Sequence, residues 1–367
     1  AYVAALAHQR AGLEVEVVAI GEPRTPEARA AAERWRATGQ GMRDPALPLP
    51  AVDAWIDGLL GIGLSRAPDD PVADLMQAVA AQRRPVLALD MPSGVDADRG
   101  SAPGAFLPAS VTLCFVAAKA GLFTGRGREA AGHVRVDALG LDVETLAAHA
   151  SVRLPCALAV RASALADALP RRHVDTHKGH HGRVLCLGGD HGMAGALVLC
   201  AEAAARGGAG WVEALSRPES VLALNVRRPE VMAAVPGLGQ GAWGRGAFET
   251  ALAAERPLVL DADALSLLAE APRAVPGAVL TPHPGEAARL LGCRPVDVQA
   301  DRFSAVLALV ARFDATVVLK GAGTLVATPG ETPRLIDAGN PGMASAGMGD
   351  ALTGVIAALR AQGLTAF

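Results

Sequence analysis

The feature that most constrains the fold is a repeated alternation of short apolar runs with longer helical stretches. Several of these runs are continuously apolar, which is typical of parallel strands that are buried on both faces. The stretches between them are long enough for the right-handed crossovers that join parallel strands. The alternation therefore predicts a doubly wound α/β architecture, in which ligands bind beyond the carboxyl ends of the strands.

The alternation occurs in two series, separated by an Ala/Arg/Pro-rich stretch at about residues 140–176. A length of 367 residues also fits two domains better than one. We predict two doubly wound domains, over residues 1–145 and 155–367. The strands expected in the first are Leu13–Ile20, Ala54–Leu60, Pro85–Leu89, Val111–Ala117 and His133–Asp137. Those expected in the second are Arg183–Leu187, Trp211–Leu215, Leu258–Leu260, Ala278–Leu280 and Thr316–Leu319. The expected helices are Tyr2–Ala11, Thr25–Thr38, Pro71–Arg83, Ala194–Arg206, Pro295–Arg312 and Ala351–Gln362.

Composition excludes several classes of protein. A hydrophobic fraction of 51% with 19% charged residues excludes global disorder. The longest apolar run, Val111–Ala118, has eight residues, whereas a membrane helix needs about 20. A net charge of −3 and 3% aromatic residues give no indication of a nucleic-acid partner. The five cysteines form no C-x-x-C pair, so we expect a cytoplasmic protein without a disulfide framework. We also expect the protein to form a homo-oligomer.

Two acidic segments follow predicted strands of the first series. Asp57 lies inside an apolar strand, just before a Gly-x-Gly turn that begins at Gly61. An ionised aspartate in a strand needs a cation or hydrogen-bond donors, because burying its charge is unfavourable. The second segment places Asp90 at a strand end and Ser93 in a Pro-Ser-Gly turn. A capping network for the next element is the simpler alternative for this segment.

These residues resemble the epimerase domain of the NAD(P)H-hydrate repair proteins, the YjeF N-terminal family, over residues 1–140. The resemblance implies that Asp57 and Ser93 help to bind a potassium ion. It also implies that Asp90 contacts the hydrated nucleotide, and we expect Asp90 to transfer protons as acid and base during epimerisation at C6. The other implied contacts with the hydrate are Gly61, Ile62, Gly63, Leu64, Ser65, Arg66 and Ala67. Family members carry an Asn-Asn-Gly-Gly-Asp-Gly loop before the position of Ala1 and a further helical segment after Gly363, so we expect this sequence to be a fragment of a longer chain.

The strongest motif of the second series runs from Gly339 to Asp350 and leads directly into an apolar helix. Its four glycines allow a ligand to approach the backbone, and the start of the helix offers unpaired N–H groups to an anion. Asp350 stands at that helix start, where it could act as a base. A plain N-cap role for Asp350 is the alternative.

Two further segments have the composition of ligand-binding turns. Lys320 is one of only three lysines and opens a Lys-Gly-Ala-Gly-Thr turn after a buried strand, where its charge could meet phosphates. His283 lies in a Pro-rich turn between a strand and a helix, and its alternative is a purely structural role. A third glycine-rich loop, 187–196, lacks the Gly-Lys-Ser/Thr of a Walker A motif.

From about His177 to the end, these segments resemble the ribokinase-like, ADP-dependent NAD(P)HX dehydratase of the same repair family. The resemblance implies contacts with the adenine nucleotide by Lys320, Gly321, Ala322, Gly323, Thr324 and Gly349. It implies contacts with the hydrate by Ala196, Gly239, His283 and Asp350. Asp350 is expected to deprotonate the C6 hydroxyl of S-NADHX or S-NADPHX, which then attacks the β-phosphate of ADP, with Mg²⁺ as the companion of the nucleotide. Elimination of the phosphate ester would return NAD(P)H, with AMP and phosphate as by-products.

The sequence has three alternatives to this assignment: a histidine metal site, a different kinase in the second half, and a non-catalytic first half. Five histidines, at positions 173, 177, 180, 181 and 191, match no standard spacing of metal ligands. The second half could instead be a ribokinase-like kinase of a small alcohol or vitamin precursor. The first half could be a non-catalytic Rossmann-like binding module, although Asp90 and the Asp57–Ser93 pair argue against that.

Overall fold

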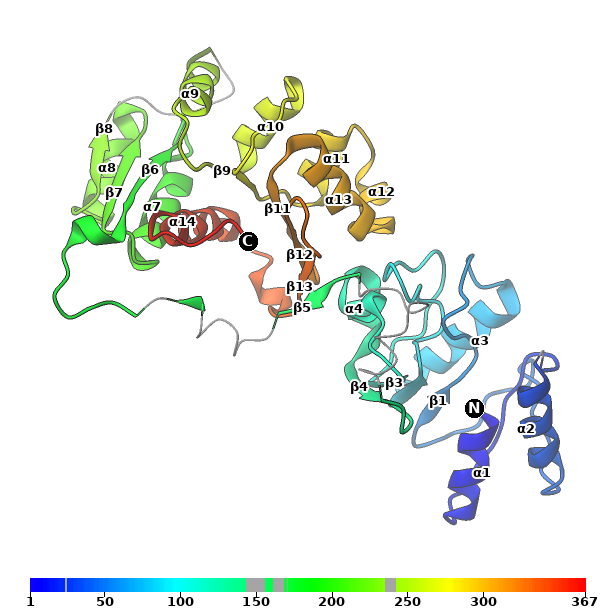
Figure 1. Ribbon diagram of the computed structural model, residues 1–367. Helices are drawn as coiled ribbons and strands as arrows, with labels where there is room; N and C mark the ends of the chain where they lie inside the picture. The colour runs from blue at the N-terminus through cyan, green and yellow to red at the C-terminus, as the bar shows by residue number, and fades with distance from the viewer. Residues whose placement is uncertain (24, 143–155, 161–167, 170, 235–241) are drawn as a thin grey trace. The chain divides into compact units, whose positions relative to one another are not determined.

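The computed structural model describes residues 1–23, 25–142, 156–160, 168–169, 171–234 and 242–367 (Figure 1). The chain divides into two compact units, Ala1–Leu154 and Pro155–Phe367. Residues 143–155, where the predicted domain boundary falls, lie outside the described residues, so the limits 1–145 and 155–367 stay a prediction.

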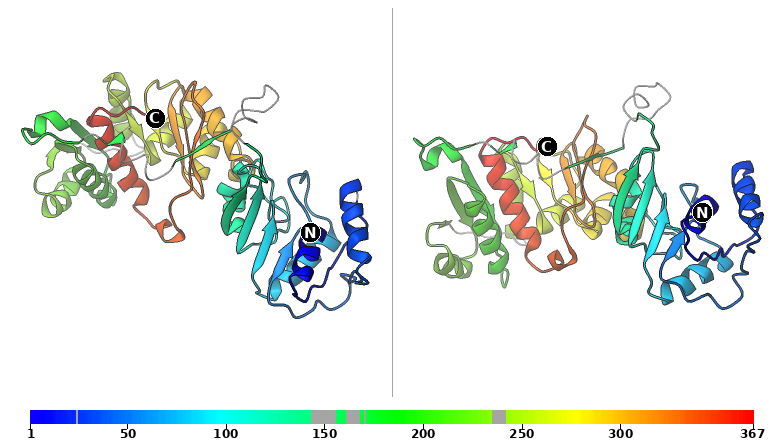
Figure 2. Two further views of the ribbon diagram at one scale, coloured as in Figure 1. Left: turned by 60° about the horizontal axis from the view of Figure 1, so that its bottom comes forward. Right: turned by 90° about the horizontal axis from the view of Figure 1, so that it is seen from below.

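The first unit contains a parallel sheet in the order β1-β2-β3-β4. Asp57 pairs with Ala88, and Leu89 pairs with Leu113, so the carboxyl ends of β1, β2 and β3 meet at one edge. Figure 2 shows the strands of this sheet side by side. The strands are β1 Trp55–Asp57, β2 Val86–Leu89, β3 Val111–Phe115 and β4 His133–Asp137. The helices are α1 Tyr2–Arg10, α2 Pro26–Arg36, α3 Asp70–Ala81, η1 Ala120–Phe123 and α4 Gly125–Ala131.

Four of the five strands predicted for this unit are confirmed, but the strand predicted over Leu13–Ile20 is wrong. That segment makes one isolated parallel bridge, between Val18 and Arg43, and no ladder. Its apolar side chains are divided between two clusters: Val15 and Val17 pack near Trp35, and Val18 packs near Met76. The apolar run therefore reflects burial on two sides of a connecting segment.

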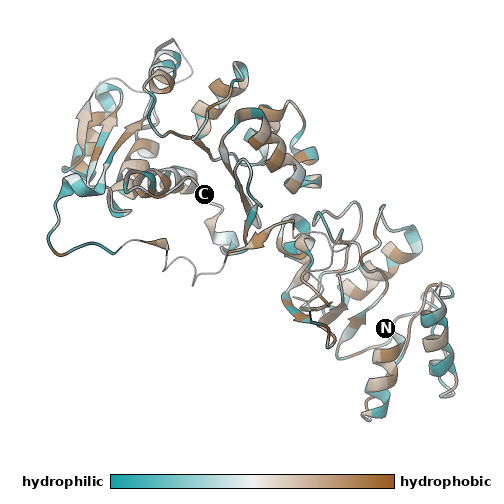
Figure 3. Ribbon diagram, in the orientation of Figure 1, coloured by the Kyte–Doolittle hydropathy of each residue, from teal (hydrophilic) through white to brown (hydrophobic). Residues whose placement is uncertain are grey.

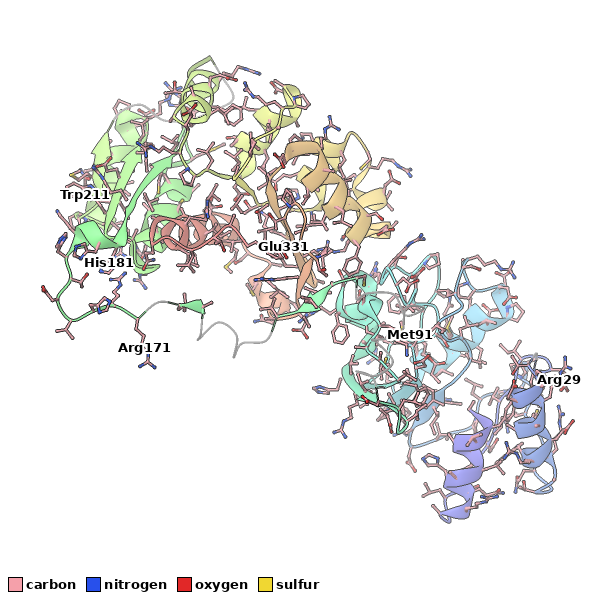
Figure 4. All side chains as sticks on the ribbon, in the orientation of Figure 1. Arg29, Met91, Arg171, His181, Trp211 and Glu331 are labelled. Atoms are coloured by element: carbon pink, nitrogen blue, oxygen red, sulfur yellow. The ribbon has the colours of Figure 1, made fainter. Side chains whose placement is uncertain are left out.

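The sheet of the first unit is held by a well-buried core. Met91, labelled in Figure 4, and Cys114 are completely buried, and they pack with Leu122 beneath the ends of β2 and β3. Figure 3 shows that α2 is mostly hydrophilic, and its completely buried Trp35 packs against α1. The packing of the core directly after Asp90 fixes the strand end from which that side chain projects.

The second unit contains two sheets. The larger has the order β5-β13-β12-β11-β10-β9, in which β9, β10 and β11 run parallel while β12 is antiparallel to both of its neighbours. The smaller is the parallel sheet β6-β7-β8. The strands are β5 Leu158–Ala159, β6 Arg183–Leu187, β7 Trp211–Leu215, β8 Met232–Ala234, β9 Val259–Leu260, β10 Val279–Leu280, β11 Thr316–Leu319, β12 Thr324–Ala327 and β13 Arg334–Ile336.

Helices surround these sheets. Their bounds are η2 Lys178–His181, α7 Ala194–Arg206, α8 Pro218–Arg227, α9 Ala242–Ala253, α10 Ala262–Glu270, α11 Pro284–Leu291, α12 Pro295–Ala300, α13 Arg302–Phe313, η3 Pro341–Met343 and α14 Met348–Ala361. Helices α7 and α14 lie side by side (Figure 1), and a Cβ on Gly354 would come within 2.1 Å of the Cys200 carbonyl oxygen. Gly354 therefore allows the two helices to approach closely.

Two helix predictions need correction in the second unit. The single helix expected over Pro295–Arg312 is two helices, because Asp301 ends α12 and caps α13 by accepting a hydrogen bond of 2.9 Å from the Ser304 N–H. The last helix begins at Met348 and not at Ala351, with Gly347 as its N-cap at φ +87°. Asp350 therefore lies in the first helical turn, and it is not the N-cap. Within the part of the chain that the structure describes, none of the helices is both long and apolar enough to cross a membrane.

Candidate functional site

In the first unit, Asp57 and Ser93 form a buried hydrogen-bonded pair at the end of β1. The Ser93 N–H donates to Asp57 Oδ2 at 2.8 Å, and the Ser93 hydroxyl donates to Oδ1 at 2.6 Å. The Leu59 N–H also donates to Oδ1, at 3.2 Å. Asp57 is 3% exposed, so burial raises the pKa of its carboxyl, while the bonds from Ser93 and Leu59 lower it.

This donor set fits a monovalent cation. Among the described residues, the groups bonded to Asp57 are neutral N–H and O–H dipoles, so its negative charge is not balanced by a cationic side chain there. Two carboxylate oxygens offer about four acceptor positions, and three are used. The Ser93 hydroxyl also accepts a bond of 2.9 Å from the Leu60 N–H. A carboxylate oxygen, a hydroxyl and the Leu60 carbonyl, whose oxygen lies 3.3 Å from Ser93 Oγ, are hard oxygen ligands, the type that binds alkali-metal ions such as K⁺.

Asp90 stands at the end of β2 in a conformation that aspartate rarely adopts, with φ at +72°. Its Oδ1 atom accepts hydrogen bonds from Lys119 Nζ and, at 3.0 Å, from the Phe115 N–H. Lys119 also donates to the Phe115 carbonyl oxygen at 2.6 Å. The two side chains are 22% and 19% exposed, so the pair is reachable from solvent but largely sheltered. The pair therefore presents a carboxylate and an ammonium together at this edge of the sheet.

The turn from Gly61 to Ala67 follows β1 on the same edge of the sheet. Its residues are largely exposed, and Ile62 keeps 62% of its surface accessible. The bond from Leu60 N–H to Ser93 Oγ fixes the beginning of this turn to the Asp57–Ser93 pair. The structure thus brings Asp57, Ser93, Asp90 and the turn to the carboxyl ends of neighbouring strands.

In the second unit, Lys320 and Asp261 face each other across the end of β10. Lys320 Nζ donates to Asp261 Oδ1 at 2.9 Å, and the Thr353 hydroxyl of α14 donates to Oδ2 at 3.0 Å. Lys320 Nζ also lies 3.8 Å from Glu286 Oε2. One carboxylate therefore connects the turn after β11 to the first turns of α14.

Asp350 lies next to this ion pair in the first turn of α14. Burial raises the pKa of the Asp350 carboxyl, the negative charge of Asp261 raises it further, and Lys320 lowers it. A Cβ placed on the preceding residue, Gly349, would lie 3.3 Å from Asp261 Oδ2 and 3.4 Å from Lys320 Nζ. The backbone of α14 thus approaches the Lys320–Asp261 pair at Gly349, one of the residues predicted to contact the nucleotide. The N–H groups of residues 348–350 precede the first intrahelical bond, from the Ala351 N–H to the Gly347 carbonyl.

His283 has a structural role as the N-cap of α11. Its Nδ1 accepts hydrogen bonds from the Gly285 N–H at 2.9 Å and the Glu286 N–H at 3.4 Å, and Glu286 accepts one from the His283 N–H at 2.8 Å. The same turn reaches the lysine, because the Lys320 N–H donates to the Pro282 carbonyl at 2.9 Å. His283 is 57% exposed at its side chain, so its ring is accessible beside this turn.

Two residues predicted to contact the hydrate are not brought to this cluster by any described interaction. Ala196 is half-buried in α7, the helix that packs against α14. Gly239 lies outside the described residues. The loop before α7 is tied down by Asp190, which accepts a bond of 2.9 Å from Arg217 Nε.

Sequence reasoning did not assign roles to two charged residues of these sites, Lys119 and Asp261. In both cases the sequence contains a feature that could have indicated a functional role. Lys119 is one of three lysines, in a chain where arginine prevails, and it follows β3 by four residues. Asp261 directly follows β9, so it stands at the carboxyl end of a parallel strand, as Asp90 does.

Comparison with known proteins gives two family matches, one in each half of the chain, which leave residues 122–183 unmatched. The family described as YjeF-related protein N-terminus matches residues 1–121. The family described as NAD(P)H-hydrate dehydratase matches residues 184–235 and 233–367. These matches cover the two halves in which the two clusters of charged residues lie.

Curated relatives cover both halves at once. The bifunctional NAD(P)H-hydrate repair enzyme of Escherichia coli (strain K12) is 39% identical over 388 residues, covering 100% of this chain and 74% of that protein. The enzyme of the same description from Leishmania braziliensis is 40% identical over 420 residues, covering 98% of this chain and 74% of that protein. A solved ribokinase-like superfamily protein from Enterococcus faecalis V583 superimposes with a TM-score of 0.53 at 27% identity, over 58% of this chain and 83% of that one. The chain belongs to the family of bifunctional NAD(P)H-hydrate repair enzymes.

Proposed function

We propose that this chain repairs hydrated NAD(P)H through two activities. The second unit dehydrates S-NAD(P)HX with ADP, and the first unit interconverts the R and S hydrates. Family membership supports the pair of activities. The observation that carries the dehydratase is the approach of Lys320, Asp261 and Asp350, which places a cation, its counter-charge and a candidate base at one helix start.

The first step of the proposed dehydration is phosphoryl transfer. Asp350 takes the proton of the C6 hydroxyl, and the oxygen attacks the β-phosphorus of ADP. The bond from that phosphorus to the bridging oxygen breaks, AMP leaves, and the hydrate carries a phosphate ester. A raised pKa suits Asp350 to this role, because a base works best when its pKa lies nearer the working pH.

In the second step, the C6–O bond of the phosphate ester breaks, phosphate leaves, and C5 loses a proton to solvent, which restores the C5=C6 double bond of NAD(P)H. The N–H groups at the start of α14 can stabilise the charge that develops on the phosphate oxygens. Lys320 can neutralise the phosphates of ADP. The backbone surface for the nucleotide is proposed to consist of the rest of its turn and the start of α14, namely Gly321, Ala322, Gly323, Thr324 and Gly349. Ala196, Gly239 and His283 are proposed to contact the hydrate.

Magnesium is proposed only as the companion of ADP. Asp261 and Glu286 are carboxylates beside Lys320, and both already accept hydrogen bonds from protein donors. Among the residues that the structure describes, there is no group of three or more His, Cys, Asp or Glu side chains that could hold a metal ion. The phosphates of the nucleotide would therefore supply most of the ligands, and Mg²⁺ would reduce their negative charge.

For the first unit, Asp90 is proposed to exchange a proton with the hydrate during epimerisation at C6. Lys119 holds the reactive carboxylate in place, and the turn from Gly61 to Ala67 contacts the nucleotide. A potassium ion at Asp57 and Ser93 would compensate the buried carboxylate and fix the start of that turn. A cytoplasmic location and a homo-oligomeric state stay predictions from the sequence.

The deciding experiment supplies S-NADHX, R-NADHX or a mixture, each with ADP, and follows the absorbance of NADH. Recovery from S-NADHX with formation of AMP supports the dehydratase, and recovery from R-NADHX as well supports the epimerase. Recovery from neither hydrate would refute the proposal. Formation of a stable phosphorylated alcohol from ATP, without recovery of NADH, would support the alternative of a small-alcohol kinase.

A further inference from the structure

A buried arginine lies directly beneath the turn proposed to bind ADP. Arg302 is the first residue of α13 and is 1% exposed, which makes it one of the largest fully buried side chains. Burial lowers the pKa of its guanidinium to about 10, so the group stays charged at neutral pH. A buried cation is unfavourable unless its hydrogen bonds are well made, so its surroundings indicate what it does.

The guanidinium donates to the carbonyl oxygens of the turn. Arg302 Nη2 lies 3.2 Å from the oxygen of Leu319, 3.3 Å from that of Lys320 and 3.4 Å from that of Gly323. These carbonyls come from both sides of the turn between β11 and β12. The other terminal nitrogen, Nη1, donates to Gln299 Oε1 at 2.8 Å, which fixes the orientation of the planar guanidinium.

Gly321 allows the turn to rest on this guanidinium. A Cβ at Gly321 would lie 3.0 Å from Nη1 and 3.2 Å from Nη2 of Arg302. Its φ of +138° is also a conformation that residues with a side chain rarely adopt. The Thr324 hydroxyl closes the turn by donating to the Gly321 carbonyl at 3.1 Å.

The direction of the carbonyls determines where the N–H groups point. In a planar trans peptide the C=O and the next N–H point in opposite directions. The Leu319 carbonyl faces Arg302, and the Lys320 N–H accordingly reaches the Pro282 carbonyl on the other side. Since the Lys320 carbonyl also faces Arg302, the Gly321 N–H points away from the guanidinium.

We propose that Arg302 is the positioning residue of the ADP-binding turn: it holds the carbonyls of Leu319, Lys320 and Gly323 inward, and so presents the opposite face of the turn to the phosphates of a nucleoside diphosphate. The positive charge of the guanidinium, beneath the turn, also attracts the negatively charged phosphates of that ligand. This inference rests on the proposed function of the turn. Lysine cannot replace the two terminal nitrogens of the guanidinium, because an ammonium does not offer parallel donors in a fixed plane.

The test compares Arg302→Lys with Arg312→Lys, an exposed arginine of the same helix. We measure the Kd of ADP by calorimetry, the KM values for ADP and S-NADHX, and the thermal midpoint. Arg302→Lys should raise the Kd and KM of ADP on the order of tenfold, as expected for the loss of hydrogen bonds from a charged group. The KM of S-NADHX at saturating ADP should stay unchanged, and Arg312→Lys should match the wild type.

A second variant keeps the inference testable if Arg302→Lys does not fold. Gly321→Ala places a methyl group against the guanidinium and should weaken ADP binding with the same selectivity. Folded Arg302→Lys or Gly321→Ala protein that binds ADP as the wild type does, or that changes both KM values by the same factor, would overturn the inference. Wild-type protein that binds no ADP would instead refute the proposed function.

Discussion

Lys320 and Asp261 form an ion pair that joins the ends of two strands on either side of β10. The Nζ–Oδ1 distance is 2.9 Å, and the side chains are 22% and 11% exposed. Both flanking strands run parallel to β10, so their carboxyl ends lie at the same edge. Because Thr353 binds the other oxygen of Asp261, the pair also fixes the position of α14, and with it Asp350, relative to the turn after β11.

Asp261→Asn should therefore affect both the geometry and the acidity of the site. The negative charge of Asp261 raises the pKa of Asp350, so its removal should lower that pKa. If the base must be ionised, the acid limb of the profile of kcat/KM against pH moves to lower pH. We also expect kcat/KM for S-NADHX to fall on the order of tenfold, because Lys320 loses its partner. Asp337→Asn, at an exposed carboxylate, is the matched control. An acid limb that does not move would contradict this electrostatic coupling.

Asp350→Asn should abolish recovery of NADH while leaving ADP binding intact. The amide has nearly the same volume but cannot accept the proton of the C6 hydroxyl, so the rate should fall by about 10²–10⁴. Stopped-flow absorbance measures the rate, and calorimetry measures ADP binding. A variant that turns over near the wild-type rate would remove Asp350 from the role of base.

Continuous apolar runs predicted most of the fold, because parallel strands buried on both faces leave that pattern. All four residues of β11 are buried, and the run Thr316–Leu319 was predicted as this strand. The hairpin strands β12 and β13 were not predicted. Thr324 lies in a glycine-rich segment whose composition indicates a ligand turn, and antiparallel return strands this short carry little periodicity of their own.

The glycine-rich turns and Asp350 could be found from local sequence, because their chemistry depends on neighbouring residues. Lys119 and Asp261 carry a local signal, but their partners, like those of Arg302, could not be assigned in that way, since packing brings the partner segments to them. Asp261 meets Thr353 across 92 positions of sequence, and Lys119 meets Asp90 across 29. The Lys119–Asp90 pair depends on the register of neighbouring strands, and the Asp261–Thr353 pair on the packing of α14 against the end of β9; a single sequence determines neither.

Lys119→Met should impair epimerisation and leave dehydration unchanged. Without the ammonium, Asp90 keeps its unusual backbone conformation and the hydrogen bond from the Phe115 N–H, but its Oδ1 loses the charged donor. The rate of NADH recovery from R-NADHX should drop on the order of tenfold or more, whereas recovery from S-NADHX stays at the wild-type rate. Lys178→Met, at a lysine that lies 3.9 Å from the Trp211 ring centre in the other unit, is the control. Equal loss with both hydrates would show that Lys119 does not act in epimerisation.

Potassium should stabilise the first unit through Asp57. Burial raises the pKa of this carboxyl, so the folded state holds its proton more tightly than the unfolded state does. Without a bound cation, stability should therefore decrease as pH rises from the unfolded pKa through the folded pKa. A cation that binds the ionised form should offset this loss, by about 2.7 kcal/mol at 100 times its Kd. Thermal unfolding in KCl and in tetramethylammonium chloride measures the effect. Asp57→Asn should remove the difference, and a difference that persists would place the cation elsewhere.

Gly94→Ala should destabilise the first unit through the same segment. Gly94 follows Ser93 at φ +93°, and a Cβ there would come within 2.2 Å of the Ala105 carbonyl oxygen and 2.7 Å of the Phe106 Cα. Since both contacts are with backbone, the loop has to move, and we expect a loss of at least about 2 kcal/mol in the free energy of unfolding. Movement of Ser93 should also weaken its bonds to Asp57, so the stabilisation by potassium should decrease together with stability. Gly41→Ala, where no atom lies within 4 Å of the added Cβ, is the control for chemical denaturation. Equal unfolding midpoints for the two variants would show that the loop tolerates the methyl group. The packing around Gly94 would then not determine the geometry of the Asp57–Ser93 pair.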